Sequence, residues 1–179
     1  MHYRGRYLGL VEAHGWEYAT RINASAVAVI IAVTDQAELV LVEQHRVPVD
    51  GPVLELPAGL VGDQGDPNEG IGAAARRELL EETGYEAGRL DRIMECPSSA
   101  GMSDEQITFF LARQLHRRGP GGGDASEDIR VHTVPLQGID HWLAARLAEG
   151  VQLDPKIYTA LYWLGAESRL AAIAPATRG

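Results

Sequence analysis

The apolar residues of this chain fall into short β-branched runs and into longer runs with helical spacing. The stretches "AVAVIIAVT" (26–34) and "AELVLVEQ" (37–44) are parted by "DQ". They predict a β-hairpin whose first strand is buried. "VLELPAG" (53–59) predicts a short strand that ends at Pro57 and Gly59. A loop rich in Gly and Asp follows.

A capped helix is predicted directly after this loop. In "DPNEG", Asp66 suits the N-cap, Pro67 the first helical position, and Glu69 follows three residues after the cap. The apolar spacing continues to Thr83, and Gly84 suits the residue in left-handed conformation that commonly ends a helix. We therefore expect one helix from the Asp-Pro pair to Thr83.

The rest of the chain predicts three more strands and two more helices. The expected strands are 89–96, 106–115 and 129–136, and the expected helices are 139–150 and 154–170. Between them lie a loop over 97–105 and a Gly-rich segment over 117–128, which we expect to be the most flexible part. Strands mixed with three helices, without strict alternation, predict an α+β or layered α/β/α domain.

Composition and charge narrow the class of protein. A net charge of −9 and an isoelectric point near 5.1 argue against a nucleic-acid binder, which would present clustered Lys and Arg. The single cysteine, Cys96, excludes an internal disulfide and suits a reducing compartment. The longest apolar run is too short to span a bilayer, and the first residues lack the apolar block of a signal peptide. We expect a cytoplasmic protein without a membrane partner.

The segment "ARRELLEETGY" (75–85) carries the candidate chemistry. On a helix, Glu78, Glu81 and Glu82 stand at i, i+3 and i+4, so their carboxylates leave one face. Such a face is commonly a solvated one, balanced here by the neighbouring arginines. Clustered carboxylate oxygens are also the ligands that Mg²⁺ prefers beside substrate phosphates.

The pattern Arg-Glu-Leu-x-Glu-Glu-x-Gly-Tyr over 77–85 resembles the box motif of Nudix hydrolases. The resemblance implies an α/β/α sandwich around a mixed sheet. We expect a small N-terminal β extension (1–24), serving base recognition and dimer contact, and a Nudix hydrolase domain (25–179). Nine residues separate Gly59 from Glu69 where the family has five, which we interpret as a loop insertion.

The resemblance also implies roles for residues of the motif. Glu78 and Glu82 are the expected central metal ligands, and Glu81 is a third ligand or the base. The expected metal is Mg²⁺, with Mn²⁺ as an alternative, and the carbonyl of Ala58 completes its site. The residues expected to hold the shape of the motif are Glu69, Arg77 and Gly84.

Segments outside the motif resemble ADP-ribose pyrophosphatases. "GWEYATR" contains Trp16, Glu17 and Arg21, and the resemblance implies that the tryptophan stacks on the base and the arginine lies near the ligand. By residue type alone, a core or dimer-contact aromatic is the favoured interpretation of Trp16. In "VEQHRVPVDGPVLELPAGL", Arg46 is expected to face the diphosphate and Glu55 to lie near the site.

A third matching segment is "DASEDIRVHTVPL" (124–136). In the related enzymes a mobile loop here carries a glutamate that orients or deprotonates the attacking water, and this role falls on Glu127, with Asp128 as the fallback. The preceding "GPGGG" is expected to give the loop freedom. The alternative is an ordinary acidic loop in solvent.

The loop after the motif widens the range of substrates. Ala100 stands where ADP-ribose-cleaving members usually have a proline, which brings related nucleoside diphosphate sugars into consideration. Serines in such a loop are often only turn formers. The loop residues considered for substrate contact are Ser98, Ser99, Met102, Ser103 and Glu105.

These observations predict a Mg²⁺-dependent hydrolase of ADP-ribose or a related nucleoside diphosphate sugar, which releases a nucleoside monophosphate and a sugar phosphate. The alternatives are a pyrophosphatase of nucleoside triphosphates and a ligand-sensing Nudix domain without catalysis. The related enzymes share pockets between subunits, so a homodimer is expected.

Overall fold

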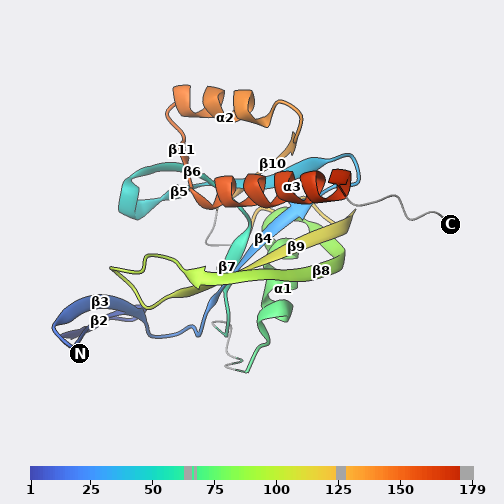
Figure 1. The fold of residues 1–179 in the computed structure, drawn as a ribbon. Coiled ribbons are helices and arrows are strands. Elements are labelled where there is room, and N and C mark those ends of the chain that lie inside the picture. The colour runs from blue at the N-terminus through green and yellow to red at the C-terminus, as the bar shows by residue number, and fades with distance from the viewer. Residues whose placement is uncertain (63–65, 67, 124–127, 174–179) are drawn as a thin grey trace.

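Fifteen elements make up the computed structural model of the chain, which describes residues 1–62, 66, 68–123 and 128–173 (Figure 1). The strands are β1 (Tyr3–Arg4), β2 (Leu8–Ala13), β3 (Trp16–Arg21), β4 (Val27–Val33), β5 (Glu38–Arg46), β6 (Gly51–Glu55), β7 (Ala58–Leu60), β8 (Tyr85–Pro97), β9 (Gln106–Arg117), β10 (Arg130–Pro135) and β11 (Gln152–Leu153). The helices are η1 (Val47–Val49), α1 (Ile71–Thr83), α2 (Ile139–Ala148) and α3 (Lys156–Ile173).

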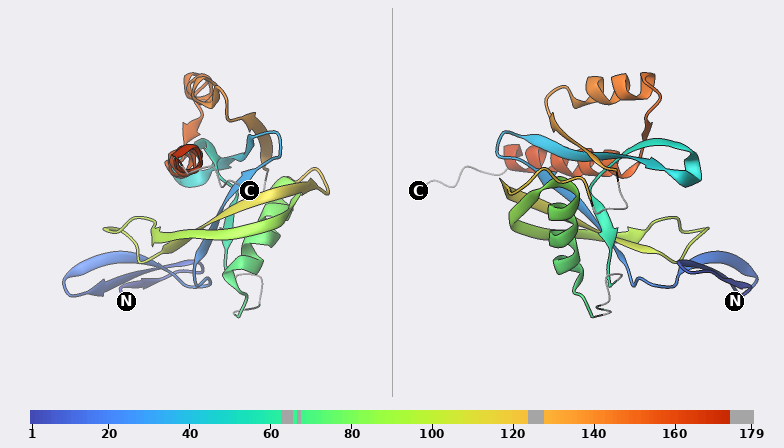
Figure 2. Two further views of the ribbon diagram at one scale, coloured as in Figure 1. Left: turned by 45° about the vertical axis from the view of Figure 1, so that its right-hand side comes forward. Right: turned by 180° about the vertical axis from the view of Figure 1, so that it is seen from behind.

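Strands β4 to β11 form one mixed sheet. Its main order is β11-β6-β5-β4-β9-β8, while β10 pairs with β5 and β7 pairs with β4. The β4–β9 and β6–β11 pairs are parallel and the other pairs are antiparallel. Helix α1 covers one face of this sheet, and α3 covers the other with α2 beyond it (Figures 1 and 2). The predicted α/β/α sandwich around a mixed sheet is therefore confirmed.

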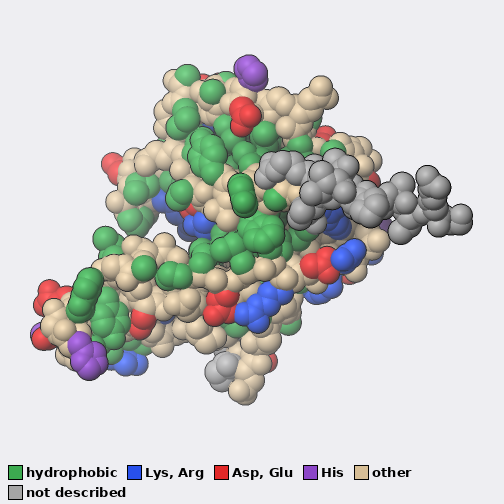
Figure 3. Space-filling model, in the orientation of Figure 1, with side chains coloured by type: hydrophobic (Ala, Val, Ile, Leu, Met, Phe, Trp, Pro, Cys, Tyr) green, Lys and Arg blue, Asp and Glu red, His purple; other side chains and the backbone are tan. Residues whose placement is uncertain are grey.

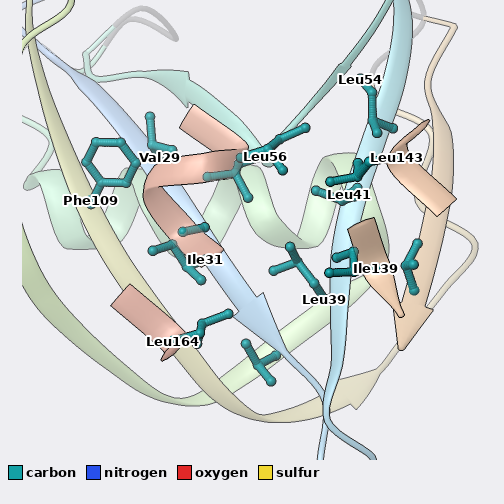
Figure 4. Packing of buried hydrophobic residues seen from close by; sticks show 14 of the residues in the cluster. Val29, Ile31, Leu39, Leu41, Leu54, Leu56, Phe109, Ile139, Leu143 and Leu164 are labelled. Atoms are coloured by element: carbon teal, nitrogen blue, oxygen red, sulfur yellow. The ribbon is translucent and has the colours of Figure 1, made fainter. Parts of the chain in front are cut away.

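The position of strand β4 in the sheet explains why its sequence is apolar at every position. Alternate side chains point to opposite faces of a strand. Val29 and Ile31 belong to the core beneath α2 and α3, which Figure 4 shows with Phe109, Leu56 and their neighbours. Ala28, Ile30 and Ala32 belong to the second core, beneath α1. Both faces are covered, so no polar position is needed.

The core beneath α1 is made largely of small residues. Ala28, Ala32 and Ala112 from the sheet meet Ala75 and Leu79 from the helix. Small side chains on both sides allow the helix to approach the sheet closely. This approach carries the charged end of α1 to the strand β7.

The start of α1 differs from the sequence prediction. The helix begins at Ile71 with Gly70 as its N-cap, and not after Asp66. Asp66 accepts hydrogen bonds from the backbone amides of Asn68 and Glu69, which closes a turn before the helix. Glycine is a weak helix former, and Gly72 adds to the cost of an earlier start. The predicted end at Thr83 with a left-handed Gly84 is confirmed.

The first three strands form a separate three-stranded sheet that projects from the body of the molecule (Figures 1 and 2). We call these strands, residues 3–21, the N-terminal arm. Its strand β3 is tied to the loop after β8, because the amide of Ala19 donates to the carbonyl of Met102 (2.8 Å). Within the described part of the chain, no helix has the length and apolar character needed to cross a membrane.

Candidate functional site

The last two turns of α1 carry the three glutamates of the motif, and strand β7 lies against them. Glu82 is only 3% exposed and accepts a hydrogen bond from the backbone amide of Ala58 (3.0 Å). A Cβ atom added to Gly59 would lie 1.9 Å from Cδ of Glu78, so the absence of a side chain at Gly59 leaves room for Glu78 in this position. Two carboxylates are thereby held against two successive residues of β7.

Arg77 holds several of the surrounding oxygen atoms. Its guanidinium donates to both carboxylate oxygens of Glu69 (3.0 and 3.2 Å) and to the carbonyl of Leu60 (3.2 Å). Its Nη1 donates to Oε1 of Glu78 (2.8 Å) and to Oε2 of Glu81 (3.1 Å). Arg77 therefore links the pre-helical turn, β7 and the acidic face of α1.

This pairing shifts the protonation of both partners. The hydrogen bond from Arg77 lowers the pKa of Glu69 below its ordinary value, and the amide of Gly62 adds to that effect while burial opposes it. The same bond raises the pKa of Arg77 against the effect of burial. The ionised pair is the stable form near neutral pH.

The depressed pKa of Glu69 predicts a pH-dependent contribution to stability. The folded state favours the carboxylate, so this contribution is present above the unfolded pKa of about 4.5 and is lost as the pH falls through the lower folded pKa. Glu69→Gln should lower the free energy of unfolding by about 1–3 kcal/mol near pH 7. The deficit relative to wild type should shrink below about pH 4.5.

Urea unfolding across this pH range measures the deficit for Glu69→Gln. The matched control is Glu86→Gln, whose exposed carboxylate pairs with exposed Arg118. We expect this control to change stability by less than about 1 kcal/mol at any pH. A deficit for Glu69→Gln that persists unchanged in acid would contradict the ion-pair account.

The acidic end of α1 opens into a cavity of about 360 Å³ between the main sheet, the loop after β8 and the start of α3. Five glutamates and three basic residues line it, together with backbone and apolar groups. The charged lining residues are Glu55, Glu78, Glu81, Glu82, Glu105, Arg21, Arg46 and Lys156. Their opposite charges, in one cavity, suit an anionic ligand accompanied by cations.

Two of the arginines are paired with glutamates across the cavity. Arg46 donates to Oε2 of Glu55 through Nε (2.9 Å), and Arg21 is bonded to Glu105. In the β5–β6 hairpin Arg46 pairs with Gly51 and Glu55 pairs with Val42, so both side chains lie on one face of the sheet. Arg21 comes from the end of the N-terminal arm, so the cavity joins the arm to the body.

Lys156 was not recognised from the sequence as a site residue. It is the only lysine of the chain and the first residue of α3. Its Nζ contacts Asp154, whose Oδ1 also accepts from the amide of Lys156 (2.7 Å). Asp154 therefore caps the start of α3, and this cap also fixes the lysine at the cavity. The signal that could have drawn attention to this residue is that lysine occurs only once in the sequence.

The structure brings together nine of the residues that the sequence analysis selected. Lining the cavity are Arg21, Arg46, Glu55, Ala58, Glu78, Glu81 and Glu82, and Ser98 and Glu105 from the loop after β8 also line it. Glu127 lies outside the described residues, so its role stays a prediction from sequence. Its fallback, Asp128, is described and does not line the cavity.

The half-buried Ser103 and four exposed residues, all selected from the sequence, do not line the cavity of their own chain. Trp16 starts β3 opposite Ala13, next to the turn at the tip of the arm, and is 65% exposed. Glu17 follows it and is also exposed. In the loop after β8, Ser99 is exposed and Met102 is 69% exposed. These side chains are available to a larger ligand or to a second subunit.

The donor set suits a hard cation, although the carboxylates do not yet converge on one point. Among the described residues, no three His, Cys, Asp or Glu side chains are close enough together to hold a metal ion. The guanidinium of Arg77 stands between Glu78 and Glu81, where it supplies a positive charge. The available ligands at this place are oxygen atoms, which is the chemistry that Mg²⁺ and Mn²⁺ favour.

Comparison with known proteins assigns the fold and motif to one family. A sequence model of the NUDIX domain matches residues 23–154. An ADP-ribose pyrophosphatase of Bacillus subtilis (strain 168) is 41% identical over 152 residues, covering 84% of this chain and 77% of that protein. A GDP-mannose pyrophosphatase of Salmonella arizonae is 36% identical over 136 residues, covering 72% and 68%.

Two further similarities complete the comparison. A methanol dehydrogenase activator of Bacillus methanolicus is 38% identical over 114 residues, which is 64% of this chain and 58% of that protein, less than two thirds of its length. A crystal structure of an ADP compounds hydrolase superimposes with a TM-score of 0.67 at 22% identity, covering 93% of this chain and 91% of that one. This last likeness supports the fold.

Proposed function

Because this chain belongs to the Nudix family, we propose that it hydrolyses the diphosphate bond of ADP-ribose or a related nucleoside diphosphate sugar. The products would be a nucleoside monophosphate and a sugar phosphate. The observation that carries the proposal is the joint lining of one cavity by three motif glutamates and three basic side chains. The pyrophosphatases of B. subtilis and S. arizonae support the class of substrate.

The carboxylates of α1 are proposed to hold Mg²⁺, with Mn²⁺ as a substitute. Glu78 and Glu82 would be the central ligands, with Glu81 and the carbonyl of Ala58 completing the site. When bound, the cation would neutralise the diphosphate and lower the pKa of the attacking water. When the cation binds, Arg77 would lose its hydrogen bonds to Glu78 and Glu81 and keep its two bonds to Glu69.

Three basic side chains are proposed to bind the phosphates. Arg21, Arg46 and Lys156 line the cavity, and each already contacts a carboxylate that a phosphate can replace as partner. Either Glu127 or Glu81 would take the proton from the attacking water. The turnover numbers of Glu127→Gln and Glu81→Gln at saturating Mg²⁺ would distinguish the two bases.

A panel of substrates tests the proposed function directly. The protein is incubated with Mg²⁺ and ADP-ribose, ADP-glucose, GDP-mannose, UDP-glucose or nucleoside triphosphates, and the products are identified by mass. We expect a nucleoside monophosphate and a sugar phosphate, and no reaction in excess chelator. Pyrophosphate release from triphosphates alone would favour the sanitising alternative, and no turnover at all would favour a ligand sensor.

We also propose a homodimer in which the N-terminal arm completes the partner's cavity. Tyr3 pairs with Leu10, and Leu8 lies two residues along the same strand, so these side chains share one face of the arm. All three are exposed, and Figure 3 shows hydrophobic side chains gathered on the arm. A small sheet with an open apolar face gains stability when a second copy covers it.

Mixing two impaired variants tests this shared site. Trp16→Ala should raise KM about 10–100-fold through lost stacking, and Glu82→Gln should lower kcat at least about 100-fold. In a mixed dimer with shared sites, one of the two cavities combines a normal arm with normal carboxylates. Random exchange should therefore restore about one quarter of wild-type activity at low substrate concentration.

The outcome separates the possible arrangements of subunits. If Trp16 serves the cavity of its own chain, the mixture recovers no activity. Sedimentation velocity provides an independent check, since a fully active monomer would refute the dimer. The cytoplasmic location, and the lack of nucleic-acid or membrane partners, stay predictions from composition that cell fractionation and nucleic-acid binding assays can check.

A further inference from the structure

The C-terminal turn of α1 needs hydrogen-bond donors from outside the helix, and it carries two of the carboxylates proposed to bind metal. The last four carbonyls of a helix have no partner within the helix. The negative end of the helix dipole also disfavours carboxylates there. Glu81 and Glu82 both lie in this turn, and α1, all of whose residues are described, has no basic residue in its last turn.

A glycine segment distant in sequence supplies the missing donors. The amide of Gly122 donates to the carbonyl of Glu82 (2.8 Å), and the amide of Gly123 donates to the carbonyl of Glu81 (3.1 Å). The sequence analysis expected these glycines to provide loop freedom. The structure instead ties them to the end of α1.

Close backbone contact makes this arrangement possible. Gly121 has φ +72°, and a Cβ atom placed on it would lie 2.4 Å from the carbonyl carbon of Thr83 and 2.6 Å from the carbonyl oxygen of Glu82. These are backbone atoms, so no side chain can move aside. A residue larger than glycine must push the segment and the helix end apart.

We propose that Gly121, Gly122 and Gly123 form an external cap that positions the carboxylates of Glu81 and Glu82 for cation binding. The cap fixes the peptide groups of the same two residues whose side chains carry the proposed chemistry. Helix ends otherwise fray, and catalytic groups must be held within about 0.5 Å of their working geometry. Gly121 is thus a positioning residue, and this inference rests on the proposed function.

Gly121→Ala tests the cap. Relieving the contact requires a shift of about 1 Å, so we expect kcat to fall about 10–100-fold while KM changes less than about threefold. In the absence of substrate, Mn²⁺ binding measured by electron paramagnetic resonance should weaken about tenfold. A purely structural role would lower the melting temperature without changing the metal affinity of the folded protein.

Two matched glycine variants control for other effects of the methyl group. Gly119→Ala lies in the same segment but meets no atom within 4 Å, and its backbone is not left-handed. Gly150→Ala has a left-handed φ of +89° and also meets nothing. Both should keep the wild-type kcat and Mn²⁺ affinity. Gly121→Ala matching them in both measurements would overturn the proposal.

Two further measurements cover the remaining outcomes. If Gly121→Ala does not fold, hydrogen exchange of the wild type decides, since the amides of Gly122 and Gly123 should be protected. Rapid exchange of both would refute the cap. If wild type itself binds no Mn²⁺, the proposed function fails, whereas tight binding by wild type and Gly121→Ala alike defeats only the cap.

Discussion

Glu82→Gln is expected to lower kcat at least about 100-fold with ADP-ribose and Mg²⁺, because even groups that only support a metal ligand cost 10–100-fold when removed. Glu82 is almost completely buried and accepts the amide of Ala58, so its carboxylate has a fixed position. Glutamine keeps the size of the side chain and an oxygen acceptor but removes the negative charge. The variant should therefore fold and bind Mn²⁺ poorly.

The measurement is steady-state kinetics at increasing Mg²⁺ or Mn²⁺, together with a thermal melt. Partial recovery at high metal concentration would indicate weakened affinity, and no recovery would indicate a lost role in the chemical step. Glu86→Gln on the neighbouring strand β8 serves as the control and should keep wild-type turnover. Undiminished turnover in Glu82→Gln would show that the acidic turn of α1 takes no part in catalysis.

Lys156→Ala is expected to lower kcat/KM about 10–100-fold, because a charge-assisted hydrogen bond to a phosphate contributes about 1.5–3 kcal/mol. Five carboxylates line the cavity, and Lys156 is one of three basic residues that offset them. Its side chain is partly buried beside Asp154, so salt screens it less than an exposed lysine. The loss should appear mainly in KM if the lysine binds the ground state and transition state alike.

Two comparisons sharpen this test. Lys156→Arg keeps the charge and should recover most of the activity, since both side chains donate to phosphate. The dependence of kcat/KM on salt should become weaker in Lys156→Ala than in wild type, because one phosphate contact has been removed. If Lys156→Ala matches wild type on every substrate of the panel, the lysine side chain only pairs with Asp154, the cap of α3.

The sequence predicted the architecture well where local rules and packing agree. The unbroken apolar run of β4 anticipated a buried strand, and packing covers both of its faces. Gly84 anticipated the end of α1, where the chain adopts φ +73°. The predicted start of α1 was wrong because an Asp-Pro pair with a following glutamate is equally compatible with an isolated turn at Asp66. Local signals could not distinguish these two, and the glycines at 70 and 72 favoured the turn.

The candidate site was predictable only as far as its motif reached. Glu78, Glu81 and Glu82 stand on one helix, so their common face follows from helical geometry. Lys156 lies far away in sequence, and its place depends on the parallel pairing of β11 with β6, where Leu153 meets Leu54. The cap on α1 likewise depends on contacts between distant backbones, which residue patterns do not reveal.

The solitary lysine has a practical consequence for chemical work on this protein. The ε-amino group of Lys156 is the only side-chain amine in the sequence, and it faces the cavity. Succinimidyl esters, aldehydes and amine-coupling biosensor surfaces will therefore modify either the main-chain amine or the cavity itself. Fluorescent labels and tethers are better attached elsewhere, for example through a thiol introduced on the exposed face of α2.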